Sequence, residues 1–292
     1  MPCYPLPLIV CFQFDSPTPV RPEKIDESPT YSFTGGLVSA TGGASITFDG
    51  FGGTGTSFGA GSVISGASIT NAIGSRVTSD SGNITINGQG GNGSTFAQIG
   101  VNIDSTGSVV ATGSANIFIN GTGGAGTTDN YGFGLEAGDH AGTAVSAVNG
   151  NITINGTATD ATGTDQDGVR FEDSVAAQLV SVTTTGAGSL TVTGAAGNND
   201  ATSAGIVIVD DTAISLSGAG NSFIADSMDI GTSAVSVNAG ANTLTLRQKT
   251  NGRAIDLGGA DSASQLALTD TELDRDSFGK TFSHCATRSL LS

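Results

Sequence analysis

Large and rigid side chains are scarce in this chain. Its 292 residues include no tryptophan, and aromatic residues make up 5% of the sequence. The cysteines Cys3, Cys11 and Cys285 all lie near the two ends, so the central part holds neither a disulfide framework nor a cysteine metal site. Because a compact globular core of this length normally uses more large side chains, any core here must be built from smaller aliphatic residues.

Basic residues are scarce as well. Ten Lys and Arg stand against 26 Asp and Glu, which gives a formal net charge of −16. A surface this acidic repels nucleic acid phosphates, and no basic stripe compensates. No apolar run has the length of a transmembrane helix, and the first residues lack the basic region and the cleavage site of a signal peptide. We expect no nucleic-acid partner, no membrane insertion by this segment and no visible signal peptide.

Glycine, by contrast, is abundant, with 45 residues, and it punctuates a repeated phrase. The sequence Asn-Ile-Thr-Ile-Asn-Gly at 83–88 returns at 116–121 as Asn-Ile-Phe-Ile-Asn-Gly and again at 151–156, and weaker copies include Ile46 and Leu190. The first apolar positions, 46, 84, 117, 152 and 190, are separated by 38, 33, 35 and 38 residues. Internal periods in this range indicate solenoids, propellers or arrays.

Two further phrases keep the same spacing. One is Gly100-Val101-Asn102-Ile103, which we align with 134–136, 168–171 and 205–208. The other covers 108–110, 144–146, 180–182 and 213–216. The repeat therefore predicts three short strands in each period of about 35 residues.

Within each strand, apolar and polar residues alternate. Ile84 and Ile86 share one face, whereas Asn83, Thr85 and Asn87 share the other. Asn-Gly after such a strand is a hairpin signal, and a propeller is a further alternative. Neither fits well, because no second strand follows at once and the aromatic signatures of propeller blades are absent.

Tracts rich in Gly, Thr and Asn follow these strands instead, as expected at the corners of a β-helix. We therefore predict an all-β fold, a parallel β-helix or β-solenoid. Stacked coils would place Ile84, Ile117 and Ile152 in one internal ladder. On the outside, Asn83, Asn116 and Asn151 would form a ladder that hydrogen-bonds between coils. The loops after the first strand vary in length, and they are either a binding face or tolerated insertions.

The two ends break the pattern. Residues 1–33 hold all seven prolines, which lack the N–H that a stacked strand must donate. Residues 276–292 show no strand alternation. We predict irregular tails at 1–33 and 276–292 around a repeat domain at 34–275. The abrupt change at both ends suggests a gene fragment, and the alternative is that the tails are caps.

One segment carries a family resemblance. Residues 242–259, NTLTLRQKTNGRAIDLGG, and their continuation 266–275, LALTDTELDR, resemble filamentous-haemagglutinin-like bacterial exoproteins when read together with the repeats. The similarity covers roughly residues 35–275. It implies a right-handed β-helix that acts as a structural or adhesive segment, outside the cell or at its surface. Host or bacterial surface glycans or proteins are the partners that it implies.

Parallel β-helices also serve as polysaccharide lyases and hydrolases, so a carbohydrate-active enzyme is the alternative. Asp210-Asp211 lies at a strand end, as paired carboxylates do in polygalacturonase-like hydrolases. The Asn-Thr-Asp and Gly-His-Gly phrases that accompany such a pair are missing here. We therefore expect no catalytic residues and no enzyme activity, with Asp210 and Asp211 facing solvent.

One acidic cluster suits a metal. The carboxylates Asp165, Asp167, Glu172 and Asp173 surround Arg170, and oxygen ligands at this density favour Ca²⁺. Their spacing does not match the loop of an EF-hand, and a solvated acidic loop is the other interpretation. We expect no other cofactor.

Overall fold

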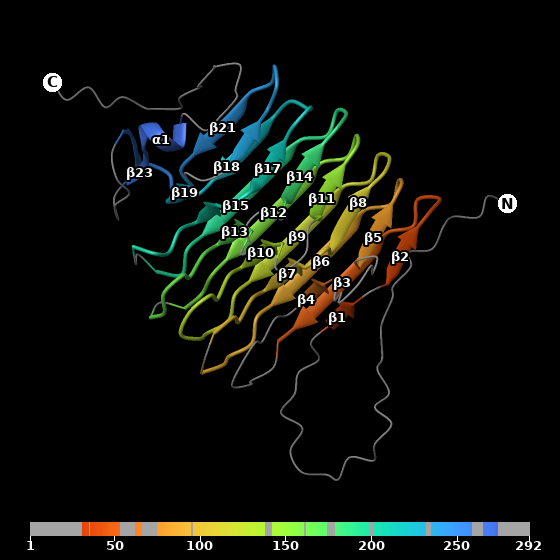
Figure 1. The fold of residues 1–292 in the computed structure, drawn as a ribbon, viewed down its shortest axis with the longest axis horizontal. Helices are drawn as coiled ribbons and strands as arrows, with labels where there is room; N and C mark the ends of the chain where they lie inside the picture. The colour runs from red at the N-terminus through yellow and green to blue at the C-terminus, as the bar shows by residue number, and fades with distance from the viewer. Residues whose placement is uncertain are drawn as a thin grey trace, which may run out of the picture.

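The chain folds into a parallel β-helix (Figure 1). The computed structural model describes residues 31–34, 36–52, 62–65, 75–94, 96–137, 142–160, 162–173, 179–198, 201–231, 235–258 and 265–273. Successive coils stack from the first strands at one end of the rod to a short helix at the other. The fold class predicted from the repeat is confirmed.

Three parallel sheets of seven strands form the walls of the rod, and each coil adds one strand to each sheet. Sheet 1 consists of β1 (Tyr31–Thr34), β4 (Ser62–Ser65), β7 (Val101–Asp104), β10 (Phe133–Glu136), β13 (Val169–Glu172), β16 (Ile206–Ile208) and β19 (Met228–Ile230). Sheet 2 consists of β2 (Leu37–Ala40), β5 (Arg76–Ser79), β8 (Ser108–Ala111), β11 (Thr143–Ala147), β14 (Val180–Thr184), β17 (Thr212–Ser215) and β20 (Ser236–Asn238). Sheet 3 consists of β3 (Ile46–Phe51), β6 (Ile84–Gln89), β9 (Ile117–Thr122), β12 (Ile152–Thr157), β15 (Leu190–Ala195), β18 (Asn221–Ile224) and β21 (Leu244–Arg247).

The core is a set of aliphatic ladders enclosed by these sheets. In sheet 3, Ile117 pairs with Ile84 on one side and with Ile152 on the other. Phe133 and Phe171 of sheet 1 meet edge to face, with ring centroids 6.0 Å apart. The inward orientation predicted for six isoleucines is confirmed, since all of them are fully buried: Ile84, Ile86, Ile117, Ile119, Ile152 and Ile154.

The outer asparagine ladder is confirmed too. Asn83 Oδ1 accepts hydrogen bonds from the backbone N–H and the side-chain Nδ2 of Asn116, both at 3.2 Å. Asn116 Oδ1 in turn accepts one from the backbone N–H of Asn151 at 2.8 Å. A second ladder runs parallel to it, because Asn155 donates to Asn120, and Asn120 donates to Asn87. Identical residues at identical places in successive coils thus bond the coils together.

Paired glycines lie where sheet 3 leads into sheet 1. A Cβ atom on Gly88 would lie 2.0 Å from the carbonyl oxygen of Gly100, and one on Gly156 would lie 2.0 Å from that of Gly168. The backbones at the base of each loop approach so closely that only glycine fits. The Asn-Gly phrase therefore marks a pinched loop base rather than a hairpin.

The loops between these glycines, which we call the arms, leave the rod side by side. Their described residues are 89–94, 96–99, 122–131, 157–160, 162–167, 195–198 and 201–204. Neighbouring arms are joined by single parallel bridges, Asn92 with Ala125 and Thr128 with Thr164. The arms thus stack as the coils do.

One predicted alignment is wrong. Phe133 pairs with Val101, so Gly132 rather than Gly134 is the equivalent of Gly100. Glycines two residues apart, in Gly132-Phe133-Gly134, made both registers compatible with the repeat. A shift of two residues keeps every side chain on the same face, so alternation could not choose between them, and the structure pairs Phe133 with Val101 and Val169.

The last coils are shorter than the others. Thr191 pairs with Ser222 and Asn221 with Leu244, which are spacings of 31 and 23 residues. In the coil that contains β18, Ala225 and Ser227 stand where the preceding coil has Gly194 and Gly205, and only Asp226 lies between them. This coil has no arm.

A separate unit, which we call the cap, covers this end of the rod. It consists of the turn after β21, the parallel pair β22 (Ala254–Leu257) and β23 (Gln265–Leu268), and the helix α1 (Asp270–Leu273). Leu266 and Leu268 are buried in the main core. Glu272 and Thr269 form a capping box, in which Glu272 Oε2 accepts the Thr269 N–H at 2.7 Å.

These boundaries refine the predicted domains. Strand β1 begins at Tyr31, so the rod starts before the predicted residue 34. The three-sheet part ends at Arg247 rather than at 275, because the last part of the predicted repeat domain forms the cap. Residues 1–30 and 274–292, with all three cysteines, lie outside the described residues.

Candidate functional site

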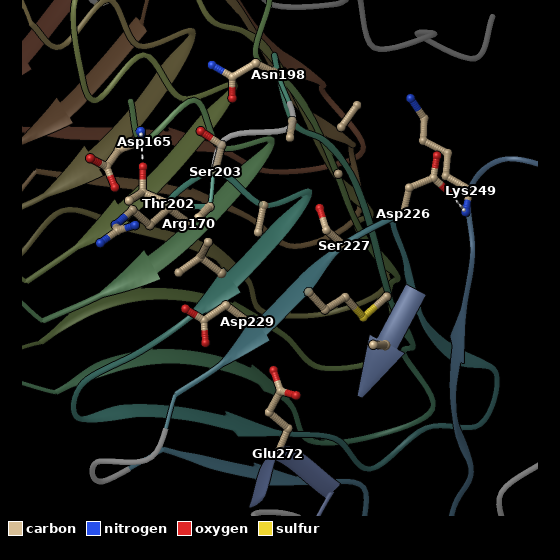
Figure 2. Close-up of a pocket in the computed structure, with 18 of the residues that line it drawn as sticks. Asp165, Arg170, Asn198, Thr202, Ser203, Asp226, Ser227, Asp229, Lys249 and Glu272 are labelled. Atoms are coloured by element: carbon tan, nitrogen blue, oxygen red, sulfur yellow. Dashed lines mark hydrogen bonds between the residues drawn. The ribbon is translucent and has the colours of Figure 1, made fainter. Parts of the chain in front are cut away.

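The coil that lacks an arm leaves a cleft at the C-terminal end of the rod. This cleft has a volume of about 1110 Å³. The last arm supplies Thr202 and Ser203 on one side, and the outer face of sheet 1 supplies Val207 and Asp229. The cap closes the opposite side, and Lys249 and Glu272 are among its lining residues (Figure 2).

Asp226 joins the cap to the armless coil. Its Oδ1 accepts the backbone N–H groups of Lys249 and Thr250, at 2.9 and 2.8 Å, and its Oδ2 accepts the Thr250 hydroxyl at 2.5 Å. Arg253 lies 4.0 Å away as an ion-pair partner. Burial raises the pKa of Asp226, but these hydrogen bonds and the Arg253 charge outweigh burial and hold the pKa below its usual value.

Two carboxylates face each other across the cleft (Figure 2). Both carboxylate oxygens of Glu272 accept hydrogen bonds within the fold. Oε1 accepts the backbone N–H of Ile230, in the last strand of sheet 1, at 3.1 Å, and Oε2 accepts the backbone N–H and the hydroxyl of Thr269. Asp229 is exposed to the cleft. Its pKa is raised by partial burial and by the charge of Glu272, and Arg170 lowers it in part.

Arg170 lies at the inner end of the cleft, where two carboxylates and an aromatic ring surround its guanidinium group. Its Nη1 donates to Asp167 Oδ2 at 2.8 Å, its Nε donates to Glu172, and its guanidinium lies 5.4 Å from the centre of the Tyr131 ring. Asp167 is fully buried and also accepts the Ala204 N–H at 2.8 Å. Burial raises the pKa of Asp167 to about 6, against the lowering effect of Ala204 and Arg170.

The predicted calcium ligands are thus divided between different tasks. Asp167 and Glu172 bind Arg170. The backbone N–H of Asp165 donates to Thr202, and Asp173 is buried at the end of β13. Across the described residues, no group of three or more His, Cys, Asp or Glu side chains is placed to hold a metal ion. The geometry gives this predicted site no support, and the buried cation among these carboxylates is Arg170 itself.

Asp210 and Asp211 lie in the turn between β16 and β17. Both have left-handed backbone conformations, with φ of 38° and 28°. Asp210 is exposed, and neither residue lines the cleft. The turn therefore places this pair away from the described concave surface.

Sequence reasoning missed a row of carboxylates along the outer face of sheet 1. Asp104, Glu136 and Glu172 are direct neighbours on β7, β10 and β13. Burial raises the pKa of Glu136 to about 7, and the charges of Glu172 and Asp104 add to this effect. The three lie at the fourth position of equivalent strands, a signal that the incorrect alignment of Gly134 hid.

Comparison with known proteins adds no family. No protein-family model, no curated protein and no solved structure matches the chain. The resemblance to filamentous-haemagglutinin-like exoproteins therefore stays a prediction. Within the described residues, the one α-helix is four residues long and no helix has the length and apolarity to span a membrane.

Proposed function

We propose that this chain is a structural and adhesive β-helix segment of a secreted or cell-surface bacterial protein, and that the cleft binds a surface glycan. The proposal rests on one observation, the place along the rod where the regular stacking of arms ends. The arms stack along the rod until one coil omits its arm, and that omission forms a cleft of about 1110 Å³. Protein sites for small ligands are concave and hold a few convergent polar groups.

The chemistry of the lining suits a ligand rich in hydroxyl groups. Thr202, Ser203, Lys249 and Asp229 all line the cleft. The hydroxyl oxygens of Thr202 and Ser203 accept the backbone N–H groups of Asp165 and Gln166, and a hydroxyl that accepts a hydrogen bond can still donate its own proton. These groups include donors and acceptors, as sugar hydroxyls require. Val207, on the outer face of sheet 1, supplies an apolar surface against which the face of a sugar ring can pack.

The experiment is a binding measurement with the full chain. Purified protein is applied to an array of bacterial and animal surface glycans, and each bound glycan is titrated by calorimetry. We expect Asp229→Ala and Lys249→Ala each to weaken binding by about tenfold, the effect of losing one polar contact of about 1.4 kcal/mol. Asp80→Ala is the matched control, because Asp80 is exposed on the turn after β5, outside the cleft. Equal affinity in all variants would refute the cleft as the binding site.

A carbohydrate-active enzyme is the second candidate, and the raised pKa of Asp229 opposite Glu272 is the observation in its favour. Glycoside hydrolysis needs a proton donor and a second carboxylate that activates water or attacks the sugar. The hydrogen bonds that Glu272 already accepts favour binding over catalysis. Release of reducing ends from a bound glycan, abolished by Asp229→Asn, would establish the enzyme instead.

A further inference from the structure

The outer face of sheet 3 is as regular in its side chains as in its backbone. From β3 to β15, threonines occupy equivalent outward places, because Thr47 pairs with Thr85, and Thr153 pairs with Thr191. Phe118 on β9 is the exception, and it lies between Thr85 and Thr153. We call this row the threonine rank.

A second row runs beside the first, two residues further along each strand. Asn87, Asn120 and Asn155 are direct neighbours in it. Asn120 Nδ2 donates to Asn87 Oδ1 at 2.8 Å, and Asn155 Nδ2 donates to Asn120 Oδ1 at 2.9 Å. Side-chain ladders of this kind keep a sheet of many strands flat. An amide Nδ2 has two hydrogens, so each of these side chains has a second one that can face water.

Together the two rows form a two-dimensional array of polar groups. Neighbouring strands lie about 4.8 Å apart, and residues two places apart along a parallel strand are about 6.6 Å apart. The oxygen atoms on a prism face of ice repeat over two similar distances in perpendicular directions. Threonine is stiff about its first side-chain torsion, and the ladder holds the asparagines. The array is therefore already ordered before anything binds to it, which reduces the cost of binding.

The threonine hydroxyls in this array are available to water. Thr85 and Thr153 are partly exposed, and neither hydroxyl has a hydrogen-bond partner among the residues that the structure describes. A hydroxyl donates one hydrogen bond and accepts up to two, so it can take the place of a water molecule at the edge of an ordered water layer. The adjacent methyl group fills the space between such positions.

The middle of this face also carries no charge. The chain has 26 acidic and ten basic residues, yet none of the outward residues of β6, β9, β12 and β15 is charged. The charged residues of this face are Asp49 on β3 and Arg247 on β21, close to its two ends. On sheet 1, by contrast, Glu136 and Glu172 point outward from central strands. A charged group holds its own hydration shell and disturbs an ice lattice, so an uncharged array suits ice.

We propose that the outer face of sheet 3 binds ice through the threonine rank and the asparagine row beside it. Water held by the hydroxyl and amide groups adopts the spacing of the crystal and joins its lattice. Ice that is pinned in this way at many points grows with a curved front, which lowers its freezing temperature. This face is separate from the cleft on sheet 1, so the inference does not depend on glycan binding there.

Thermal hysteresis tests the proposal with the full-length chain. It is the gap between the melting and the freezing temperature of a single small ice crystal, and dissolved ions do not produce it. We expect the wild-type chain to open such a gap. We also expect fluorescently labelled protein to be incorporated into a growing ice hemisphere, which excludes proteins that do not bind ice.

Three variants locate the binding face. Thr153→Lys places a long charged side chain in the threonine rank and should abolish both hysteresis and incorporation. The matched control is Thr183→Lys, which adds the same charge to the outer face of sheet 2, where Ser146 and Ser215 are the neighbours and no threonine rank exists. It should keep both properties. Phe118→Thr completes the threonine rank and should raise hysteresis above that of the wild type.

Circular dichroism and the melting temperature show whether each variant folds, and a gain in Phe118→Thr cannot result from misfolding. Exclusion of the wild-type chain from ice, without hysteresis, would overturn the proposal. Equal losses in Thr153→Lys and Thr183→Lys would do the same, as would a Phe118→Thr chain with no gain. Retention of the wild type on crystalline chitin or cellulose, without incorporation into ice, would assign the face to a polysaccharide instead.

Discussion

The middle coils and the last coils of the rod contain the same three strands but are stabilised differently. Around β9 and β12, each residue has an equivalent above and below it, and the same contact is made repeatedly, as in the asparagine ladder. Around β18 and β21 the contacts occur once each. Asp226 binds the turn after β21, and Glu272 accepts the N–H of Ile230. Repetition stabilises the middle, and individual polar contacts close the end against edge-to-edge pairing.

The largest expected difference between the two regions is in the aliphatic ladder. Ile152 is fully buried between Ile117 and Leu190, whereas Leu244 is in the terminal strand of sheet 3 and is 8% exposed. We expect Ile152→Ala to lower the free energy of unfolding by about 2–5 kcal/mol, and Leu244→Ala to lower it less. Urea unfolding followed by circular dichroism measures both.

Thr153→Ala is the control for this comparison, because Thr153 neighbours Ile152 on the outer face of the same strand. It should change stability far less than Ile152→Ala. Equal losses at residues 152 and 153 would contradict the assignment of faces. Equal losses at 152 and 244 would contradict the difference between the two regions.

A smaller effect is expected where the arms leave the rod. A Cβ on Gly156 would lie 2.0 Å from the carbonyl oxygen of Gly168, a backbone atom that cannot move aside cheaply. Gly156→Ala should therefore destabilise the chain by about 1–3 kcal/mol through overpacking. In the armless coil, Ala225 already occupies the corresponding place, so Ala225→Gly should cost less.

Chemical unfolding of the two variants side by side measures this difference. A Gly156→Ala chain as stable as the wild type would show that the loop base relaxes freely, and the glycine pairs would then have no structural role.

The middle of the rod could be predicted from sequence because its contacts recur. Ile84, Ile117 and Ile152 recur at nearly equal spacing, which identifies them as equivalent residues of successive coils. The alternation of apolar and polar residues assigns their side chains to the inner face. Register was harder to predict where small residues crowd together, as at Gly132 and Gly134. Because Gly134 was aligned in the wrong register, the row formed by Asp104, Glu136 and Glu172 was not detected from the sequence.

The end of the rod could not be predicted in the same way. The cleft depends on an arm that is missing and on Glu272 reaching Ile230 across 42 residues of sequence, a contact that no repeat foreshadows. Each contact that builds the cleft is made only once in the rod, so no repeated sequence pattern could predict it.

The smallest expected effect concerns the cap and pH. Because its hydrogen bonds and Arg253 hold the pKa of Asp226 below the usual value of about 3.9, the ionised carboxylate is favoured in the folded state. Its stabilising contribution is therefore present above that pH and is lost as the pH falls through and below it. We expect hydrogen exchange at Lys249 and Thr250 to accelerate, relative to the intrinsic rate, between about pH 5 and pH 3, while strand β12 stays protected.

Asp226→Asn should show fast exchange at these two amides already at neutral pH, since a neutral amide accepts these hydrogen bonds more weakly than a carboxylate. Simultaneous loss of protection in the cap and in β12 would mean that the rod unfolds as one unit, and the distinction between a repetitive middle and an individually anchored end would fail.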